Sequence, residues 1–530
     1  MKPFAALLDR LVLTPQRNAK LRLLVDYFAT VPDPDRGWGL AALTGELAFK
    51  NAKAGLIREL ATARVDPVLF GWSYDFVGDL AETTALVWPA RPTGRDWPHL
   101  PEVVTALKAG SRASLPETVE GWLDALDATG RWALLKLITG GLRVGVSARL
   151  AKTALAVHGD QEVGAIEEVW HGLAPPYGEL FAWLEVRGPR PGLADKPVFR
   201  PLMLANPLED HEVAALDLEA YVAEWKWDGI RVQLAALGGD ARLYSRTGDD
   251  IGASFPEIVE GVGFEGVLDG ELLVKRGAEV ASFNDLQQRL GRKAPTARLI
   301  ESHPAVVHLY DILFDGTEDL RGLALLERRA RLAAFVERHR PARLDVPPLV
   351  PFAALADLDA LRRGCRGSER EGLMLKRKDS RYLAGRPRGP WFKWKRDALT
   401  LDCVLMYAQR GHGRRSSFYS DYTFGVWRAK DAGAGEGGLE LVPVGKAYFG
   451  FTDAELLQLD RHVRDHTTRR YGPVREVAAN LVLEIAFDSV HRSTRHKSGV
   501  AMRFPRVHRI RWDKPAAEAD RLETVERLVE

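Results

Sequence analysis

The chain has 530 residues, 46% of them hydrophobic and 28% charged, which is the composition of an ordinary soluble globular protein. Its formal net charge is only +2, so any attraction to nucleic acid has to come from local patches. The two cysteines, Cys365 and Cys403, exclude a disulfide framework and a cysteine-based zinc site, and they suit a reducing cytoplasm.

Residues 1 to about 195 are predicted to be mostly helical, because apolar residues recur there at helical spacing. Met1 to Val12 indicates an amphipathic helix and not a signal peptide. No stretch approaches the roughly 18 apolar residues of a membrane span, so we expect no membrane contact. Apolar stripes recur at Phe4, Leu7, Leu8 and Leu11, at Leu21, Leu24, Val25 and Phe28, at Val119, Trp122, Leu123 and Leu126, and at Leu150, Ala151 and Leu155.

A glycine-rich turn, Thr139 to Ser147, interrupts these helices. Such a turn before a helix can hold a phosphate through backbone N–H groups, with Arg143 nearby. Its glycines can equally well end one helix and start the next. The sequence favours neither interpretation.

A proline-rich segment, Arg187 to Pro207, is typical of a linker, and β-rich runs follow it. The first run begins at Tyr221, and Glu224 to Arg231 is predicted to be the end of this strand running into a turn at Asp228-Gly229, with the next strand from Arg231 to Leu237. Side chains alternate along a strand, so Glu224 and Lys226 share one face with Asp228 while two tryptophans face the other way. A lysine among such charges is either a nucleophile, if other cations and burial lower its pKa, or a solvated edge residue.

The strand Val267 to Val274 carries two acids, Asp269 and Glu271, on one face. A carboxylate in an apolar strand is costly unless it is paired or metal-bound, so at least one should be functional or salt-bridged. A further strand, Ala305 to Phe314, contains Tyr310-Asp311, and an Arg-rich amphipathic helix is predicted from Leu323 to His339.

Two later strands add lysines. In Glu371 to Arg377 the side chains of Glu371 and Lys376 fall on opposite faces of a regular strand, so either the strand has a bulge or the two groups approach a site from different directions. Lys393 and Lys395 share one face of their strand. They are either two solvated lysines or, beside carboxylates, a phosphate clamp.

From Asp397 onward the chain is strand-rich around one helix, Asp453 to Thr467, which suits a small β-barrel of the oligonucleotide-binding (OB) type. Its last part is strongly basic and is predicted to contact phosphates. The basic residues from His491 to Lys514 are Arg492, Arg495, Lys497, Arg503, Arg506, Arg509, Arg511 and Lys514, with Asp513 as the acid.

The ordered set Lys226-x-Asp-Gly, Asp269-Gly-Glu271, Tyr310-Asp311, Glu371-Gly and Lys393-x-Lys395 resembles the covalent nucleotidyltransferases, and within them the larger ATP-dependent DNA ligases. The resemblance extends to residues 141–145, 201–204 and 498–514. It implies a multi-domain protein. The implied parts are an all-α DNA-binding domain (1–195), an α+β adenylation or nucleotidyltransferase domain (196–396) and a C-terminal OB-fold β-barrel (397–530).

The resemblance also implies a role for each motif residue. Lys226 would carry AMP, Glu224 would accept from the adenine amino group and Tyr310 would stack on adenine. Arg231 and Arg246 would contact ribose and phosphates, or the 5′-phosphate of the nick. Glu271 and Glu371 would serve the ribose and a divalent metal, Mg²⁺ or Mn²⁺. The α-phosphate and pyrophosphate would be held by Lys376, Lys393 and Lys395, and the leaving pyrophosphate would be oriented by Arg509, Arg511, Asp513 and Lys514. The counterparts of Arg386 and Arg388 are ambiguous.

The implied function is sealing of 5′-phosphate/3′-hydroxyl nicks in duplex DNA through lysyl-AMP and a DNA-adenylate, by a cytoplasmic monomer acting in repair, replication or recombination. The alternatives are an RNA ligase or other nucleotidyltransferase, such as a capping enzyme, and a catalytically silent DNA-end-binding protein. The helical N-terminal region and Glu224 argue against the first, and the presence of every expected polar residue argues against the second.

Overall fold

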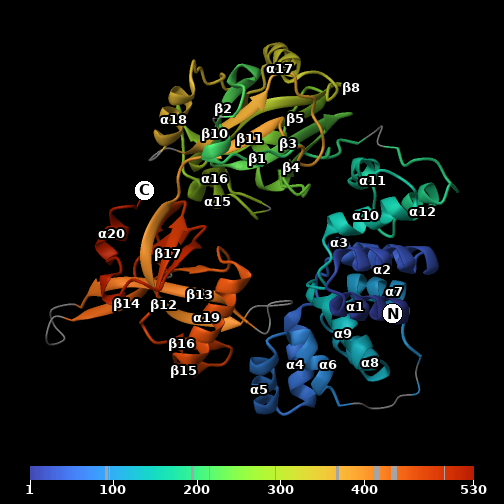
Figure 1. Cartoon of the computed structure of the whole chain (residues 1–530). Helices are drawn as coiled ribbons and strands as arrows, with labels where there is room; N and C mark the ends of the chain where they lie inside the picture. The colour runs from blue at the N-terminus through green and yellow to red at the C-terminus, as the bar shows by residue number, and fades with distance from the viewer. Residues whose placement is uncertain are drawn as a thin grey trace. The chain divides into compact units, whose positions relative to one another are not determined.

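The computed structural model describes residues 1–529 except 90–93, 95, 193–195, 214, 293, 366–368, 411–417, 431–437 and 495. The chain divides into two compact units, one made of residues 1–158 and 398–530 and the other of residues 159–397. Helices fill the N-terminal part, and strands dominate from about residue 206 onward (Figure 1). Among the described residues, no helix is both long and apolar enough to cross a membrane.

The N-terminal region consists of ten helices in its described part, as predicted. The apolar stripe of the first helix, Phe4 to Leu11, is buried, and α9 is buried along most of its length from Gly130 to Ile138, packing on α1 and α6. The helices are α1 (Lys2–Leu13), α2 (Arg17–Thr30), α3 (Asp35–Thr44), α4 (Ala54–Arg64), α5 (Pro67–Val77), α6 (Leu80–Val87), α7 (Leu100–Ala109), α8 (Leu115–Ala125), α9 (Ala128–Thr139) and α10 (Ala148–His158).

The unit 159–397 begins with two helices, α11 (Val163–Trp170) and α12 (Gly178–Leu184). Glu168 of α11 pairs with Arg200 at 2.7 Å and with Arg321 at 2.9 Å, so α11 is tied to this unit by two ion pairs. The domain limits at 195 and 396 remain predictions.

Two sheets form most of this unit, and their pairs are antiparallel except β1 with β11 and β7 with β9. The smaller has the order β1-β11-β10-β2, and the larger has β4-β3-β5-β7-β8, with β6 on β5 and β9 on β7. The strands are β1 (Asn206–Pro207), β2 (Tyr221–Trp227), β3 (Ile230–Leu237), β4 (Asp240–Ser245), β5 (Gly266–Arg276), β6 (Glu279–Val280), β7 (Ala305–Asp315), β8 (Glu318–Asp319), β9 (Leu344–Asp345), β10 (Arg370–Arg377) and β11 (Trp391–Lys395).

Helices cover the outer faces of both sheets. Leu332 and Phe335 of α17 pack on the larger sheet, and Leu358 of α18 packs on the smaller one. Between the sheets lies a third apolar cluster that includes Val222 and Trp391 from the smaller sheet and Ala235 and Val267 from the larger. The helices of this part are α13 (Asp210–Val213), α14 (Pro256–Val259), α15 (Phe283–Gln287), α16 (Ala297–Ser302), α17 (Leu325–His339) and α18 (Leu355–Arg363).

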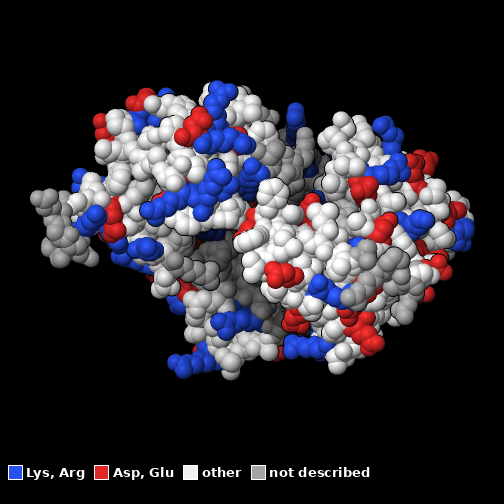
Figure 2. Space-filling view, turned by 90° about the horizontal axis from the view of Figure 1, so that it is seen from below, with Lys and Arg blue, Asp and Glu red and all other residues white. Residues whose placement is uncertain are grey.

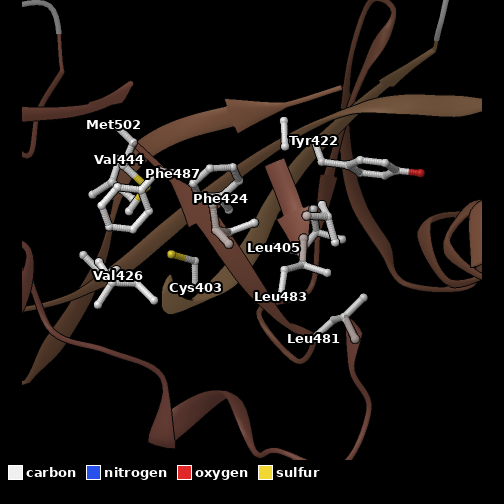
Figure 3. Packing of buried hydrophobic residues seen from close by; sticks show 14 of the residues in the cluster. Cys403, Leu405, Tyr422, Phe424, Val426, Val444, Leu481, Leu483, Phe487 and Met502 are labelled. Carbon is white, nitrogen blue, oxygen red and sulfur yellow. The ribbon is translucent and has the colours of Figure 1, made fainter. Parts of the chain in front are cut away.

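The C-terminal region is a curled antiparallel sheet, β14-β13-β12-β16-β15, in which β17 joins β12 to β20. Its core includes Cys403, Phe424 and Phe487 (Figure 3), and α19 contributes Leu459 and Val463. The elements are β12 (Leu399–Arg410), β13 (Tyr419–Ala429), β14 (Leu439–Ala447), α19 (Asp453–Asp465), β15 (Thr467–Tyr471), β16 (Val474–Val477), β17 (Val482–Phe487), β18 (Ser489–Arg492), β19 (Val500–Arg503), β20 (Arg506–Arg511) and α20 (Leu522–Glu526).

Charges on the surface gather locally. On the face in view in Figure 2, Lys and Arg form patches next to areas dominated by uncharged or acidic residues. A small net charge therefore coexists with basic local surface.

Candidate active site

The face between the two sheets changes from apolar to charged along two strands, β2 and β5. On β2 the series is Val222, Glu224, Lys226, and on β5 it is Val267, Asp269, Glu271. Residues two apart on a strand share a face, so each charged group is aligned with an apolar residue of the core between the sheets. The predicted alternation around Lys226 is confirmed.

Strand pairing brings four expected residues side by side. In the smaller sheet Lys226 lies opposite Gly372, which lies opposite Lys395, and Glu224 aligns through Met374 with Lys393. Directly opposite residues of antiparallel strands point to the same side of the sheet. The two lysines of β11 therefore share a face with Lys226 and Glu224.

A bulge in β10 resolves the two alternatives for Glu371 and Lys376. Pairing to β2 skips one residue between Arg370 and Gly372, so Glu371 turns toward the face of Lys226, and Lys376 is also on that face. Gly372 has φ +145°, and a Cβ there would lie 2.2 Å from the Trp394 carbonyl oxygen. The bulge therefore requires glycine.

The ammonium group of Lys226 donates a hydrogen bond to Oε2 of Glu371, and Lys395 Nζ lies 3.3 Å from the same oxygen. Burial raises the pKa of Glu371, but the two lysines outweigh it and lower that pKa to about 2. These three side chains form one charged cluster.

The expected lowering of the Lys226 pKa is wrong for this structure. Burial does lower it, but Glu371, Glu271 and Asp228 together outweigh burial and raise the pKa above its ordinary value. The sequence pattern shows the cations, but not that carboxylates from β5, from β10 and from the turn after β2 all act on Lys226. The pKa of Glu271 is raised to about 7, chiefly by burial.

Glu224 is held by two cations. Its Oε2 lies 2.6 Å from Nζ of Lys376, and its Oε1 accepts a hydrogen bond from NH1 of Arg329 at 2.8 Å. Lys376 is only 2% exposed, and its ammonium group lies 4.3 Å from the ring centroid of Tyr310 and 4.4 Å from that of Trp391. Lys376 therefore contacts the carboxylate and two rings.

Asp269 is the salt-bridged acid that the apolar strand required. It is fully buried and accepts hydrogen bonds from Arg231 (3.1 and 2.6 Å), Tyr310 (3.1 Å) and Tyr382 (2.6 Å). Arg231 also donates to the carbonyl oxygen of Met203 at 2.7 Å. Asp269 thus fixes both Arg231 and the hydroxyl end of Tyr310.

The backbone connection between the two sheets is closely packed. Gly229 connects β2 to β3, and a Cβ there would lie 2.6 Å from the Leu272 carbonyl oxygen and 2.8 Å from Cγ of Glu271. Only glycine fits this close approach. The turn predicted at Asp228-Gly229 therefore passes from one sheet to the other.

Several cations act electrostatically on Lys393. Its pKa is lowered by burial and then by Lys395, Arg386, Lys226 and Arg246, so these side chains act on one another electrostatically. Arg246 is exposed. Arg386, which the sequence left ambiguous, belongs to this group. Arg388 is exposed.

The C-terminal residues belong to the other compact unit. Arg511 pairs with Asp513 at 2.9 Å and with Asp402 at 3.4 Å, and Lys514 pairs with Asp402 at 2.8 Å. Arg509 is exposed on β20. Arg495 of the basic segment lies outside the described residues.

No group of three or more His, Cys, Asp or Glu side chains in the described part of the chain is arranged to hold a metal ion. Mg²⁺, however, commonly uses one or two carboxylates together with substrate phosphates. Glu271 and Glu371 both act electrostatically on Lys226, so two carboxylates are available beside the lysine. This donor set fits a cation that substrate helps to bind.

Two contact residues were missed by the sequence analysis. The Arg-rich helix 323–339 was predicted, but its periodicity does not say that Arg329 reaches Glu224 on β2. Tyr382 is an isolated tyrosine outside any strand, and no pattern marks it. Both depend on packing between distant segments.

Comparison with known proteins covers the whole chain. Residues 202–395 match the family model described as ATP dependent DNA ligase domain, and residues 415–514 match the ATP dependent DNA ligase C terminal region. A probable DNA ligase of Koribacter versatilis is 35% identical over 421 residues, covering 74% of this chain and 71% of that protein. DNA ligase 1 of Korarchaeum cryptofilum is 31% identical over 561 residues, covering 100% of this chain and 98% of that protein.

The solved structure Pmar-Lig_Pre has a TM-score of 0.60 at 16% identity, with 96% of this chain and 99% of that chain covered. This likeness concerns the fold alone. It extends over the helical, α+β and β-rich parts described above.

Proposed function

Because the chain belongs to the family of ATP-dependent DNA ligases, which join DNA strands through a lysyl-AMP intermediate, we propose that Lys226 is the lysine that carries AMP. One observation carries this assignment. Lys226 lies in a row with Lys395 on the face shared by the motif residues, and its ammonium group contacts Glu371. Solvated edge lysines have no such surroundings.

In the first step, Nζ of Lys226 attacks the α-phosphorus of ATP. A P–N bond forms, the bond from the α-phosphorus to the bridging oxygen breaks, and pyrophosphate leaves. The attacking amine must first lose a proton, and the hydrogen bond to Glu371 holds that proton in the free enzyme. When the negative charge on Glu371 is offset, the pKa of Lys226 falls and the proton passes to solvent water, which leaves the neutral amine to attack.

The carboxylates and cations around Lys226 suit phosphate chemistry. Glu271 and Glu371 would hold a divalent cation, Mg²⁺ or Mn²⁺, whose contribution is to neutralise phosphate charge. Lys393 and Lys395 would hold phosphate oxygens, aided by Arg246 from the β4 turn. In the following steps AMP passes to a 5′-phosphate, and the adjacent 3′-hydroxyl displaces it to seal the nick.

Base recognition would be carried out by residues of the same face that lie away from Lys226, around Glu224. Glu224 would accept from the adenine amino group, and Tyr310, held by Asp269, would stack on the ring. Lys376 is paired with Glu224 and buried, which supports a place beside the base more than on the phosphates. Arg231, paired with Asp269, would support the ribose side.

The remaining assignments are also proposals. The C-terminal region would be an OB-fold whose Arg509, Arg511, Asp513 and Lys514 orient the leaving pyrophosphate. The protein would act as a monomer on nicked duplex DNA. The two buried free cysteines suit a cytoplasmic location.

Intact-mass measurement tests the assignment of Lys226. With ATP and Mg²⁺ the protein should gain one adenylate, and Lys226→Ala should gain none while still binding nicked duplex DNA. An adenylate on the Lys226→Ala protein would move the nucleophile elsewhere. Better charging by GTP than by ATP would favour a capping enzyme, and absence of any adduct would favour a silent end-binding protein.

A further inference from the structure

The carboxylate of Glu224 is clamped between two elements that are distant in sequence. Nζ of Lys376 on β10 forms an ion pair with Oε2 at 2.6 Å, and Arg329 on α17 donates a hydrogen bond to Oε1 at 2.8 Å. The second terminal nitrogen of Arg329 donates to the Pro347 carbonyl oxygen at 3.0 Å. All three charged side chains are at most 11% exposed.

We propose that Arg329 is a positioning residue for base selection, which orients Glu224 so that the enzyme discriminates purines by the group at their C6 position. The inference rests on the proposed contact between Glu224 and the adenine amino group. Arg329 itself would touch no part of the nucleotide. Its effect would be transmitted through one carboxylate.

The helix places Arg329 rigidly. The preceding residue, Arg328, is fully buried and donates to Asp311 (2.8 and 2.9 Å) and to the carbonyl oxygens of Leu323 and Ser380. These bonds fix the first turn of α17 on the larger sheet. The next side chain points about 100° further around the helix, which directs Arg329 toward β2.

The chemistry explains why two cations are needed. A carboxylate has about four acceptor positions, so each oxygen can accept from one cation and still accept an N–H from a base. With one oxygen hydrogen-bonded to Arg329 and the other paired with Lys376, the carboxylate is held in one orientation. A fixed carboxylate favours a C6 amino group, which donates, and disfavours a C6 carbonyl, which can only accept.

The competing interpretation is that Arg329 only braces α17 against the smaller sheet. A brace would affect every nucleotide equally. A positioning role would affect only nucleotides with a C6 donor. The two interpretations therefore predict different preferences for a nucleotide with a C6 amino group over one without it.

The experiment compares ATP with the triphosphate of unsubstituted purine riboside, which lacks the C6 amino group. Adduct formation is followed by intact mass at increasing nucleotide concentration for wild type, R329Q, R329K and E224Q. The control is R331Q, from the same helix, whose partners are the more exposed Asp315 and Glu318. Binding of α,β-methylene analogues of both nucleotides, which cannot transfer their nucleotide, gives a readout independent of turnover.

For R329Q we expect the KM for ATP and the Kd of its methylene analogue to rise by about ten-fold or more, the loss of one hydrogen bond to a charged group. The values for the purine nucleotide and the kcat with ATP should stay within about two-fold. R329K should recover part of the selectivity, E224Q should match R329Q, and R331Q should behave as wild type.

Equal losses for both nucleotides, or no loss for ATP, would overturn the inference. Thermal unfolding checks that each variant is folded, and if R329Q fails to fold, R329K is judged by the same ratio. Failure of the proposed function is distinct, since wild type would then form no adduct with ATP. If the wild type forms the adduct with ATP but R329Q has the same preference for ATP over the purine nucleotide as the wild type, only the role of Arg329 is ruled out.

Discussion

Lys226 and Lys395 share one acceptor, Oε2 of Glu371, although they lie on strands separated by β10. The bulge at Gly372 makes this arrangement possible, because it turns Glu371 to the face on which both lysines lie. The same carboxylate keeps Lys226 charged in the absence of substrate.

Removing that carboxylate should change both the rate and its pH dependence. Glu371 raises the pKa of Lys226, so E371Q should lower that pKa and shift the rising limb of the pH–rate profile to lower pH. The plateau rate should nevertheless fall by at least about ten-fold, because phosphate charge is then poorly neutralised. Adduct formation measured from pH 6 to 10 (about the range where lysine can respond) checks this. An unshifted limb would contradict it.

Lys393 should matter for adenylation and little for DNA binding. K393A removes one cation from the group around Lys226, and we expect adduct formation to slow by about 100-fold. Affinity for a nicked duplex, measured by gel shift, should remain within about two-fold. R377A is the matched control, because Arg377 ends β10 in an exposed pair with Asp379. Equal rates for K393A and wild type would take Lys393 out of the site.

The network around Asp269 should be a large source of stability. D269N leaves the buried guanidinium of Arg231 without its charged partner, which should cost about 3 kcal/mol of unfolding free energy in urea. D379N, which disturbs the exposed pair with Arg377, should cost less than about 1 kcal/mol. Similar costs for the two variants would mean that the buried pair is not a special source of stability.

Glu271 should make stability fall with rising pH when no metal is present. Its pKa is about 7 in the folded chain and ordinarily 4.5, so the folded state binds the proton more tightly. That contribution is complete below pH 4.5 and is lost as pH rises toward 7. Melting temperatures in EDTA across this range should show a decline that E271Q reduces. An identical decline in E271Q would assign the effect to other groups.

The period of two along strands was sufficient to predict which face carries Glu224, Lys226, Asp269 and Glu271. It could not decide the orientation of Glu371, because a bulge depends on the partner strand. The strands predicted at 267–274, 305–314 and 371–377 lie within two residues of their observed limits. Six of the ten helices α1 to α10, namely α3 to α7 and α9, were not predicted individually.

Interactions between distant segments were the other gap. The contact of Arg329 with Glu224 joins residues 105 positions apart, and the direction of the Lys226 pKa shift depends on carboxylates from three segments. The local sequence pattern shows neither this contact nor the direction of this pKa shift. The expectation of a salt-bridged acid in β5, in contrast, follows from the cost of burying a lone charge, and Asp269 fulfils it.

The extra residue in β10 interrupts regular backbone pairing, but it keeps Glu371 and Lys376 on the same face of the sheet. Deleting Gly372 would let β10 pair with β2 without interruption and would remove a backbone conformation that other residues rarely adopt. The same deletion would turn either Glu371 or Lys376 to the far side of the sheet. A shortened strand could thus fold more regularly and yet lose an ion pair at Lys226 or at Glu224, so stability-guided redesign of this segment would select against the enzyme.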